Sequence, residues 1–250
     1  MNAFEQPGYE ESKSPLRRAQ VVFVIDTTGS MNPVLDALKE AIFSIARIYA
    51  NFRIKSEFGL IEFRHIPSLS SGEALRRVSF PPPPTNYWTE DDSTFSEQVT
   101  NLVAQGGGQF RESINEALKE ASNSDWDSKT STKRVILLVT DSKPDQNYLT
   151  TEEVVEYFTA AGIDQFYTLS DPRYFGEYDI LSEAQVRGDG GDITVHQLPL
   201  ESPLDVEKIN NQFKEFAEHS GYGITTSVQD TGDDGDGDDD STANSGVIGT

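Results

Sequence analysis

The chain has 250 residues, a formal net charge of −22 and no cysteine. This length suits one α/β domain of about 200 residues with tails. The negative charge argues against nucleic acid or an anionic membrane as a partner, and the lack of cysteine excludes disulfides and thiolate chemistry. No apolar run reaches the roughly 18 residues of a membrane span, and the amino terminus lacks an apolar signal core. We therefore expect a cytoplasmic protein.

The composition divides the chain into three parts. Residues 1–19 are polar and broken by proline and glycine, which predicts a flexible leader. Residues 20–222 are predicted to form one folded domain. Residues 223–250 are predicted to be a disordered acidic tail, since such a composition cannot bury a core. Removing the seven Asp of residues 224–250 from the total of −22 leaves −15 for the rest.

The first motif is VVFVIDTTGSM at residues 21–31. Its five consecutive apolar residues predict a strand buried on both faces. Asp26, Thr28 and Ser30 alternate in the turn that follows, where open α/β sheets place their ligand sites. One carboxylate and two hydroxyls converging there would suit a hard cation such as Mg²⁺, Mn²⁺ or Ca²⁺. The simpler alternative is that Thr28 and Ser30 cap the next helix.

The remaining elements alternate between helix and strand. We expect, in order, a helix at 33–50, a strand at 53–65, a short antiparallel strand at 76–80, a helix at 95–103, a loop at 105–109 leading into a helix around 114–121, a strand at 134–141, a helix at 151–161, a strand at 165–169, a helix at 174–186, a strand at 193–198 and a helix at 203–218, with Gly221 and Gly223 ending the folded part. This alternation predicts a doubly wound, mostly parallel sheet with helices on both faces and one short antiparallel edge strand.

Two further stretches carry candidate functional residues. The four prolines at 81–84 favour polyproline II, which suits either a peptide ligand of SH3 or WW domains or, as we prefer, a stiff connector. Tyr87 and Trp88 follow them and are candidate anchors for a partner, since aromatic residues often dominate interface energy. The apolar stretch at 134–141, RVILLVTD, ends in Asp141, whose simpler role would be an Asx-turn.

Three motifs in a fixed order resemble the von Willebrand factor type A domain over residues 20–219. DTTGSM at 26–31 resembles the D-x-S/T-x-S signature of that family. GGGQFRESINEAL at 106–118 resembles its second metal loop and the following helix, and VILLVTDSKPD at 135–145 resembles its third loop. The position of Trp126, about ten residues ahead of the third motif, is similar to that of a tryptophan in intracellular members of the family.

The resemblance implies a metal-ion-dependent adhesion site at the top of the sheet. Asp26, Thr28 and Ser30 would be ligands from the first loop, and Asp141 would be the carboxylate of the third. Gln109 stands where the family has a threonine or an aspartate, and it offers an amide oxygen without charge. This departure would either leave the metal less neutralised, and so more attractive to an anion, or weaken the site.

The family also implies how such a site is used. Members bind a partner protein by letting its Glu or Asp complete the metal shell, and intracellular relatives often work beside AAA-type ATPases or kinases. Gly107 and Gly108, next to the second loop's ligand position, are candidate partner contacts. We therefore expect a non-enzymatic interaction module, with a metal-free scaffold as an alternative.

One enzyme interpretation competes with this expectation. DTTGS also resembles the D-K-T-G-T motif of the haloacid dehalogenase superfamily, in which Asp26 would be a phosphatase nucleophile and Asp189 and Asp192 would hold Mg²⁺. The sequence lacks the lysine after Asp26, and GDGGD at 188–192 follows LSEAQVR, which indicates the end of a helix rather than a buried strand. The chain also has no nucleophile elbow, zincin motif or Walker loop.

Overall fold

A computed structural model describes residues 17–64, 75–81, 86–106, 111–187 and 191–226, without the side chains of 111 and 112. Its main sheet has six strands in the order β3-β2-β1-β5-β7-β8. The strands are β1 (Arg17–Asp26), β2 (Ile54–Phe63), β3 (Leu75–Arg77), β5 (Thr132–Thr140), β7 (Gln165–Ser170) and β8 (Thr194–Pro199). All neighbours are parallel except the edge strand β3, which runs antiparallel to β2. The predicted doubly wound architecture is confirmed.

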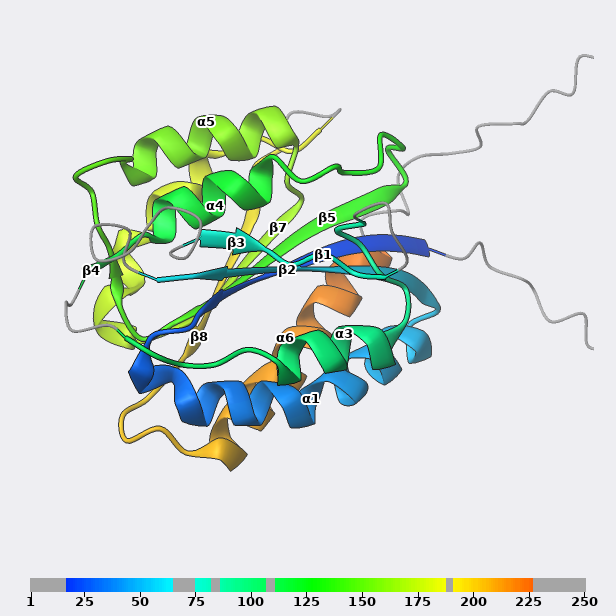
Figure 1. The fold of residues 1–250 in the computed structure, drawn as a ribbon. Helices are drawn as coiled ribbons and strands as arrows, with labels where there is room; N and C mark the ends of the chain where they lie inside the picture. The colour runs from blue at the N-terminus through cyan, green and yellow to red at the C-terminus, as the bar shows by residue number, and fades with distance from the viewer. Residues whose placement is uncertain (1–16, 65–74, 82–85, 107–110, 188–190, 227–250) are drawn as a thin grey trace, which may run out of the picture.

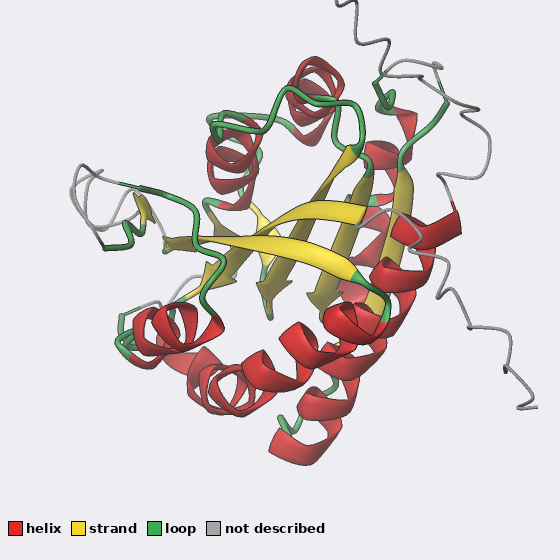
Figure 2. Ribbon diagram, turned by 90° about the vertical axis from the view of Figure 1, so that its right-hand side faces the viewer, coloured by secondary structure: helices red, strands yellow, loops and turns green. Residues whose placement is uncertain are grey.

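Helices cover both faces of this sheet (Figures 1 and 2). One face carries α1 (Asn32–Asn51), α3 (Asp92–Thr100) and α6 (Val206–Thr226), and the other carries α4 (Ile114–Ser122) and α5 (Thr151–Ala161). Short 3-10 turns complete the described chain: η1 (Gly29–Met31), η3 (Pro172–Glu177) and η4 (Asp179–Glu183). A separate two-stranded pair joins β4 (Arg111–Glu112) to β6 (Lys143–Pro144).

The central strand β1 is buried on both sides. Val21, Phe23 and Ile25 lie in the core under α1, α3 and α6, whereas Val22 and Val24 lie in the core under α4 and α5. Because consecutive side chains of a strand point to opposite faces, a strand covered by two helical layers must be apolar at every position. This requirement explains the uninterrupted apolar run of the first motif.

The sheet begins earlier than the sequence predicted. β1 starts at Arg17, within the expected leader, because Arg17 pairs with Ile54 and Arg18 pairs with Thr132 of the neighbouring strands. The guanidinium of Arg18 also lies 3.3 Å from the carboxylate of Glu57 on β2. Charged residues are tolerated at the end of a strand where the sheet meets water. The polar composition of this part of β1 therefore led to its prediction as part of the leader.

The last helix runs on through the two glycines that were expected to end it. α6 reaches Thr226, and a Cβ on Gly221 would come within 2.7 Å of the Phe52 ring. A Cβ on Gly223 would come within 2.5 Å of the Gln165 amide nitrogen. Both glycines therefore serve close packing, which competes with the helix-ending role that their low helix propensity suggests.

The helix predicted at 174–186 is wrong. Residues 172–183 form η3 and η4 instead, with backbone bonds from Tyr178 to Phe175 and from Leu181 to Tyr178. The tighter 3-10 winding matches the side-chain spacing that buries Tyr178 and Leu181 under the sheet.

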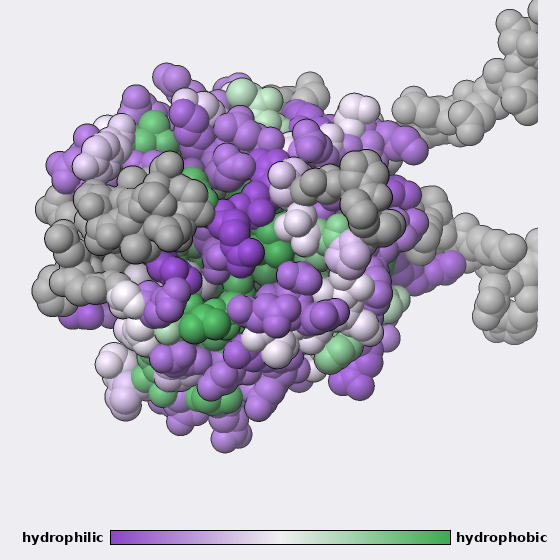
Figure 3. Space-filling view, viewed as in Figure 1, coloured by the Kyte–Doolittle hydropathy of each residue, from purple (hydrophilic) through white to green (hydrophobic). Residues whose placement is uncertain are grey.

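The surface is mostly polar on the face that Figure 3 shows, where hydrophobic residues appear only in small separate areas. Among the helices of the described ranges, none is both long enough and apolar enough to cross a membrane.

Gly162 gives a test of this packing. It ends α5 with a left-handed φ of 58°, and a Cβ there would collide with the side chain of Arg187. We expect Gly162→Ala to lower the free energy of unfolding by about 1–3 kcal/mol, through backbone strain and overpacking. Urea denaturation measures the loss.

The matched control is Gly176→Ala, since Gly176 has no positive φ and open space around its Cβ position. It should leave the urea midpoint nearly unchanged. Equal losses at the two glycines would contradict the packing argument.

Candidate functional site

The candidate site lies at the carboxyl end of the sheet, around Asp26. This last residue of β1 is fully buried, and its two carboxylate oxygens accept three hydrogen bonds. Oδ1 accepts from the backbone N–H of Thr28 at 2.8 Å and from the Thr28 hydroxyl at 2.7 Å, and Oδ2 accepts from the Thr140 hydroxyl at 2.7 Å. Such bonds offset part of the cost of burying a carboxylate.

Thr28 contacts this carboxylate directly, and Ser30 lies next to Thr28. Their hydroxyl oxygens are 3.5 Å apart. Neither η1 nor α1 receives a side-chain cap, so the capping alternative is not what the described residues show. Because the Thr28 hydroxyl donates its one proton to Asp26, the lone pairs of its oxygen stay available to a cation or a hydrogen-bond donor.

The third loop brings a residue that sequence reasoning missed. Thr140 ends β5 next to Asp26 because Ile25 pairs with Val139 in the parallel register. Its hydroxyl accepts a hydrogen bond at 3.1 Å from the Ser142 N–H while donating to Asp26. The signal was present in the sequence as a threonine at the end of a second buried strand, but only strand pairing shows which residues meet.

Asp141 also lies at this edge. It is half-buried, and its Oδ1 accepts a hydrogen bond at 3.3 Å from the Ser142 hydroxyl. Its negative charge contributes to raising the pKa of Asp26. The sequence-predicted residues Asp26, Thr28, Ser30 and Asp141 are therefore brought to one edge of the sheet, and the described part of the group contains two carboxylates.

The electrostatics of Asp26 are dominated by burial. Desolvation raises its pKa from 3.8 to about 6, and Asp141 adds to this, while the bonds from Thr28 and Thr140 act in the opposite direction. Loss of water disfavours the charged carboxylate because little solvent remains to stabilise it.

Backbone bonds tie the first and second loops together. The N–H of Gln105 donates to the Thr27 carbonyl, and the N–H of Gly29 donates to the Gly106 carbonyl, both at 3.0 Å. A Cβ on Gly29 would lie 3.1 Å from that carbonyl oxygen, a tight contact with the backbone of the second loop. Arg64 adds a further link, with its Nε donating to the Thr27 hydroxyl at 3.0 Å. Gln105 and Gly106, which begin the second loop, are thus held beside the first loop. Gly107, Gly108 and Gln109 lie outside the described residues.

The aromatic candidates are not brought to this edge. The ring of Trp88 packs against Trp126, with centroids 5.1 Å apart, and its indole N–H donates to the Asp125 carbonyl at 3.0 Å. The ring of Tyr87 lies under the guanidinium of Arg77. Trp88 lines a groove with Gln20 and Glu57, in the middle of β1 and β2 and away from Asp26.

The phosphatase interpretation is not favoured by the topology. Asp192 precedes β8, which belongs to the same parallel set as β1, so Asp192 lies at the amino-terminal edge of the sheet and Asp26 at the opposite one. Asp189 lies outside the described residues. Because a nucleophile and the metal that assists it must be adjacent, Asp192 cannot serve Asp26 in this fold.

Residues 21–143 match the family model of the von Willebrand factor type A domain. The match supports a von Willebrand factor type A domain protein. It spans Asp26, Thr28, Ser30 and Asp141, the four residues that the fold brings together.

Solved structures show a similar fold. A mutant of the PilB minor pilin from Streptococcus sanguinis aligns with a TM-score of 0.56 and 11% identity, covering 87% of this chain and 65% of that one. Two structures of proximal thread matrix protein 1 from the mussel byssus align with TM-scores of 0.54 and 0.55 at 11% and 12% identity, covering 82% and 81% of this chain and 48% and 47% of theirs. The chain thus spans less than two thirds of each of these structures. No curated protein sequence matches it.

The raised pKa of Asp26 predicts an unusual pH dependence. Folding favours the protonated form of the Asp26 carboxyl, because its pKa is about 6 in the folded chain and 3.8 otherwise. Its contribution to the stability of the metal-free chain is therefore full below pH 3.8 and is lost as the pH rises through about 6. Asp26→Asn should therefore gain stability over the natural chain between pH 4 and pH 7.5, by about 3 kcal/mol at most. Urea unfolding in the presence of a chelator measures the difference.

Asp171→Asn is the matched control, with the opposite sign. Asp171 follows β7 at the same edge of the sheet, and hydrogen bonds from Arg173 lower the pKa of its carboxyl. Its replacement should cost stability at neutral pH. A natural chain that is more stable than Asp26→Asn at pH 7.5 would contradict the account of Asp26.

Proposed function

We propose that this domain is a protein-interaction module that holds a divalent cation at the carboxyl end of its sheet. The observation that carries the proposal is the meeting of Asp26, Thr28, Ser30 and Asp141 at one edge. The family match over residues 21–143 supports a von Willebrand factor type A domain, and such domains commonly mediate protein interactions. The metal and its role are the proposal.

The donor set fits a hard cation. Every group offered is an oxygen, from two carboxylates and two hydroxyls, which suits Mg²⁺, Mn²⁺ or Ca²⁺ rather than zinc. A carboxylate that is fully buried and lies near a second carboxylate is also costly without a counterion. A cation near Asp26 and Asp141 would remove that cost, so the electrostatics and the ligand chemistry support the same proposal.

Each residue would have its own role in holding the cation. Thr28 and Ser30 would offer hydroxyl oxygens, with the Thr28 hydroxyl oriented by its bond to Asp26. Asp26 and Asp141 would supply negative charge, and Thr140 would hold Asp26 in place as a positioning residue. Gln109, if it completes the second loop's contribution, adds no charge.

Charge balance suggests the partner group. A divalent cation held by two carboxylates is close to neutral, which leaves it more attractive to an additional anion than a site with three carboxylates. We propose that a Glu or Asp of a partner protein completes the metal shell, and that an AAA-type ATPase or a kinase complex supplies this partner. No catalytic step is assigned to these residues.

Calorimetric titration of Mg²⁺ and Mn²⁺ tests the metal site. The full chain should be used with its seven carboxyl-terminal Asp changed to Asn, so that their loose cation binding does not obscure the site. We expect one ion per chain, no binding in Asp26→Ala, and at least about tenfold weaker binding in Asp141→Asn, a change of about 1.4 kcal/mol.

Asp171→Asn serves here as a control for loss of one charge at the same edge and should bind the metal normally. Adding acetate to the Mn²⁺-loaded chain, and following water proton relaxation, tests whether a carboxylate displaces metal-bound water. Equal binding by the Asp26→Ala and natural sites would overturn the assignment. No binding by any form would favour a metal-free scaffold.

A further inference from the structure

The carboxyl edge of the sheet carries a guanidinium beside the proposed cation site. Arg64 follows directly after β2, whose last residue, Phe63, pairs with Asp26. The Nε of Arg64 donates to the Thr27 hydroxyl at 3.0 Å, and its Nη2 donates to the Val103 carbonyl at 3.2 Å. These two bonds hold Arg64 between the first loop and the segment that leads into the second loop.

Arg64 has no ion-pair partner among the described residues. The nearby Arg76 pairs with Glu62. Arg173, at the same edge of the sheet, pairs with Asp171. By contrast, both groups that Arg64 bonds are neutral oxygens. A guanidinium has five N–H donors in a planar fork that matches a carboxylate, so the remaining donors of Arg64 are suited to an anion from outside the described chain.

The place is open to a partner and close to the proposed cation ligands. Arg64 is half-buried, the side chain of Val103 beside it is 58% exposed, and Ser30 is exposed. Because Thr27 and Thr28 are consecutive residues, the Nε of Arg64 lies at most about 12 Å from the Thr28 hydroxyl. Alternate side chains of an extended peptide lie on one side, about 7 Å apart, so two carboxylates of one peptide can span this separation.

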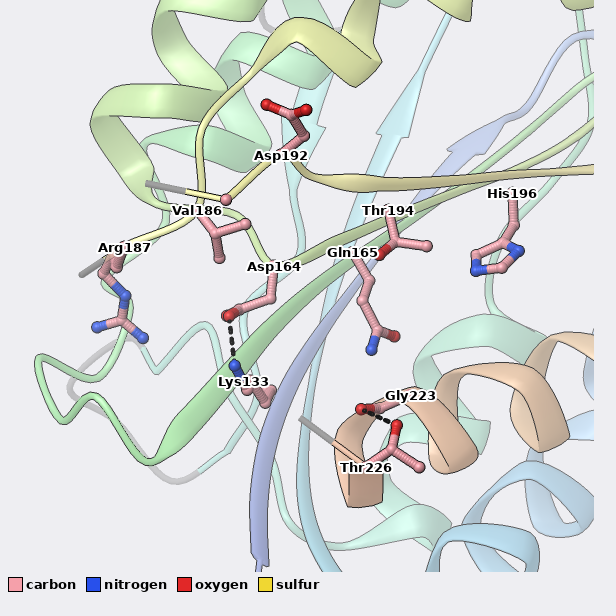
Figure 4. Close-up of a pocket in the computed structure, with 11 residues that line it drawn as sticks. Lys133, Asp164, Gln165, Val186, Arg187, Asp192, Thr194, His196, Gly223 and Thr226 are labelled. Carbon is pink, nitrogen blue, oxygen red and sulfur yellow. Dashed lines mark hydrogen bonds and ion pairs between the residues drawn. The ribbon is translucent and has the colours of Figure 1, made fainter. Parts of the chain in front are cut away.

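The opposite edge of the sheet does not offer the same chemistry. A cavity of about 380 Å³ lies there among β5, β7, β8 and the end of α6 (Figure 4). Its described lining includes two cations and two carboxylates: Lys133, Arg187, Asp164 and Asp192. Lys133 pairs with Asp164 at 2.9 Å. Since the charges of this cavity are balanced, we assign it no charged ligand.

We propose that Arg64 determines the specificity of the interaction surface, and that the surface prefers an extended acidic segment with carboxylates two residues apart. One carboxylate would bind the cation, and the other would pair with the Arg64 guanidinium. The inference rests on the proposed cation site, which supplies the first contact. Because two hydrogen bonds already hold Arg64 in place, pairing costs little side-chain entropy.

Two tripeptides, acetylated and amidated at their ends, test this preference on the Mn²⁺-loaded chain. Asp-Ala-Asp carries both carboxylates, whereas Asp-Ala-Asn carries only the first. The full chain should again have its seven carboxyl-terminal Asp changed to Asn, so that they do not compete with the peptides. Calorimetry should show at least about threefold tighter binding of Asp-Ala-Asp, as expected for one partly exposed ion pair. In Arg64→Gln the ratio of the two affinities should fall to about one.

The matched control is Lys143→Gln, which removes the same charge from β6, two residues after Asp141. It should weaken both peptides in equal proportion and leave their ratio unchanged. Arg64→Lys keeps the charge without the planar fork and should give an intermediate ratio. Mn²⁺ titration and urea denaturation of each variant establish that the cation site and the fold are intact.

The outcomes separate this inference from the proposed function. Normal Mn²⁺ binding without a preference for Asp-Ala-Asp, or with a preference that depends on Lys143 instead of Arg64, would overturn the role of Arg64 and leave the cation site standing. Absence of Mn²⁺ binding in the chain that retains Arg64 would overturn the cation site, and this inference with it.

Discussion

The site depends on one costly placement, a carboxylate buried at the end of the central strand. Asp26 has no access to solvent, and only three hydrogen bonds compensate its desolvation. The polar residues around it are explained by this need. Thr28 folds its backbone and its hydroxyl toward Asp26, and Thr140 approaches from the adjacent strand. The polar groups at this edge thus surround the Asp26 carboxylate, whose charged form the fold by itself stabilises poorly.

Parallel pairing is what makes this arrangement possible. The carboxyl ends of β1 and β5 lie side by side, so the loops after them share one edge although 114 positions separate Asp26 from Thr140. Both faces of these strands are covered by helices, which leaves the strand ends as the places where polar groups can meet a ligand. The opposite edge follows the same rule and gathers the starts of β5, β7 and β8 around a separate cavity.

The two edges differ in how their charges are balanced. The carboxyl edge carries Asp26 and Asp141 near each other, whereas at the amino-terminal edge Lys133 pairs with Asp164, and the charges of Asp164 and Asp127 act on Arg134. The two carboxylates that lie near each other are therefore found at the carboxyl end of the sheet, and the apolar core separates them from the charges of the other edge.

The sequence by itself determined the sheet and the first candidate ligands. Uninterrupted apolar runs at β1 and β5 specified buried parallel strands, and Asp26, Thr28 and Ser30 follow the first of them because a polar turn must end such a strand. Tertiary structure alone decided the rest. Thr140 became a partner of Asp26 through strand register, Gly221 and Gly223 stayed helical because Phe52 and Gln165 pack against them, and Trp88 was held by Trp126. These outcomes depend on contacts between residues distant in the chain, which local composition and periodicity do not encode.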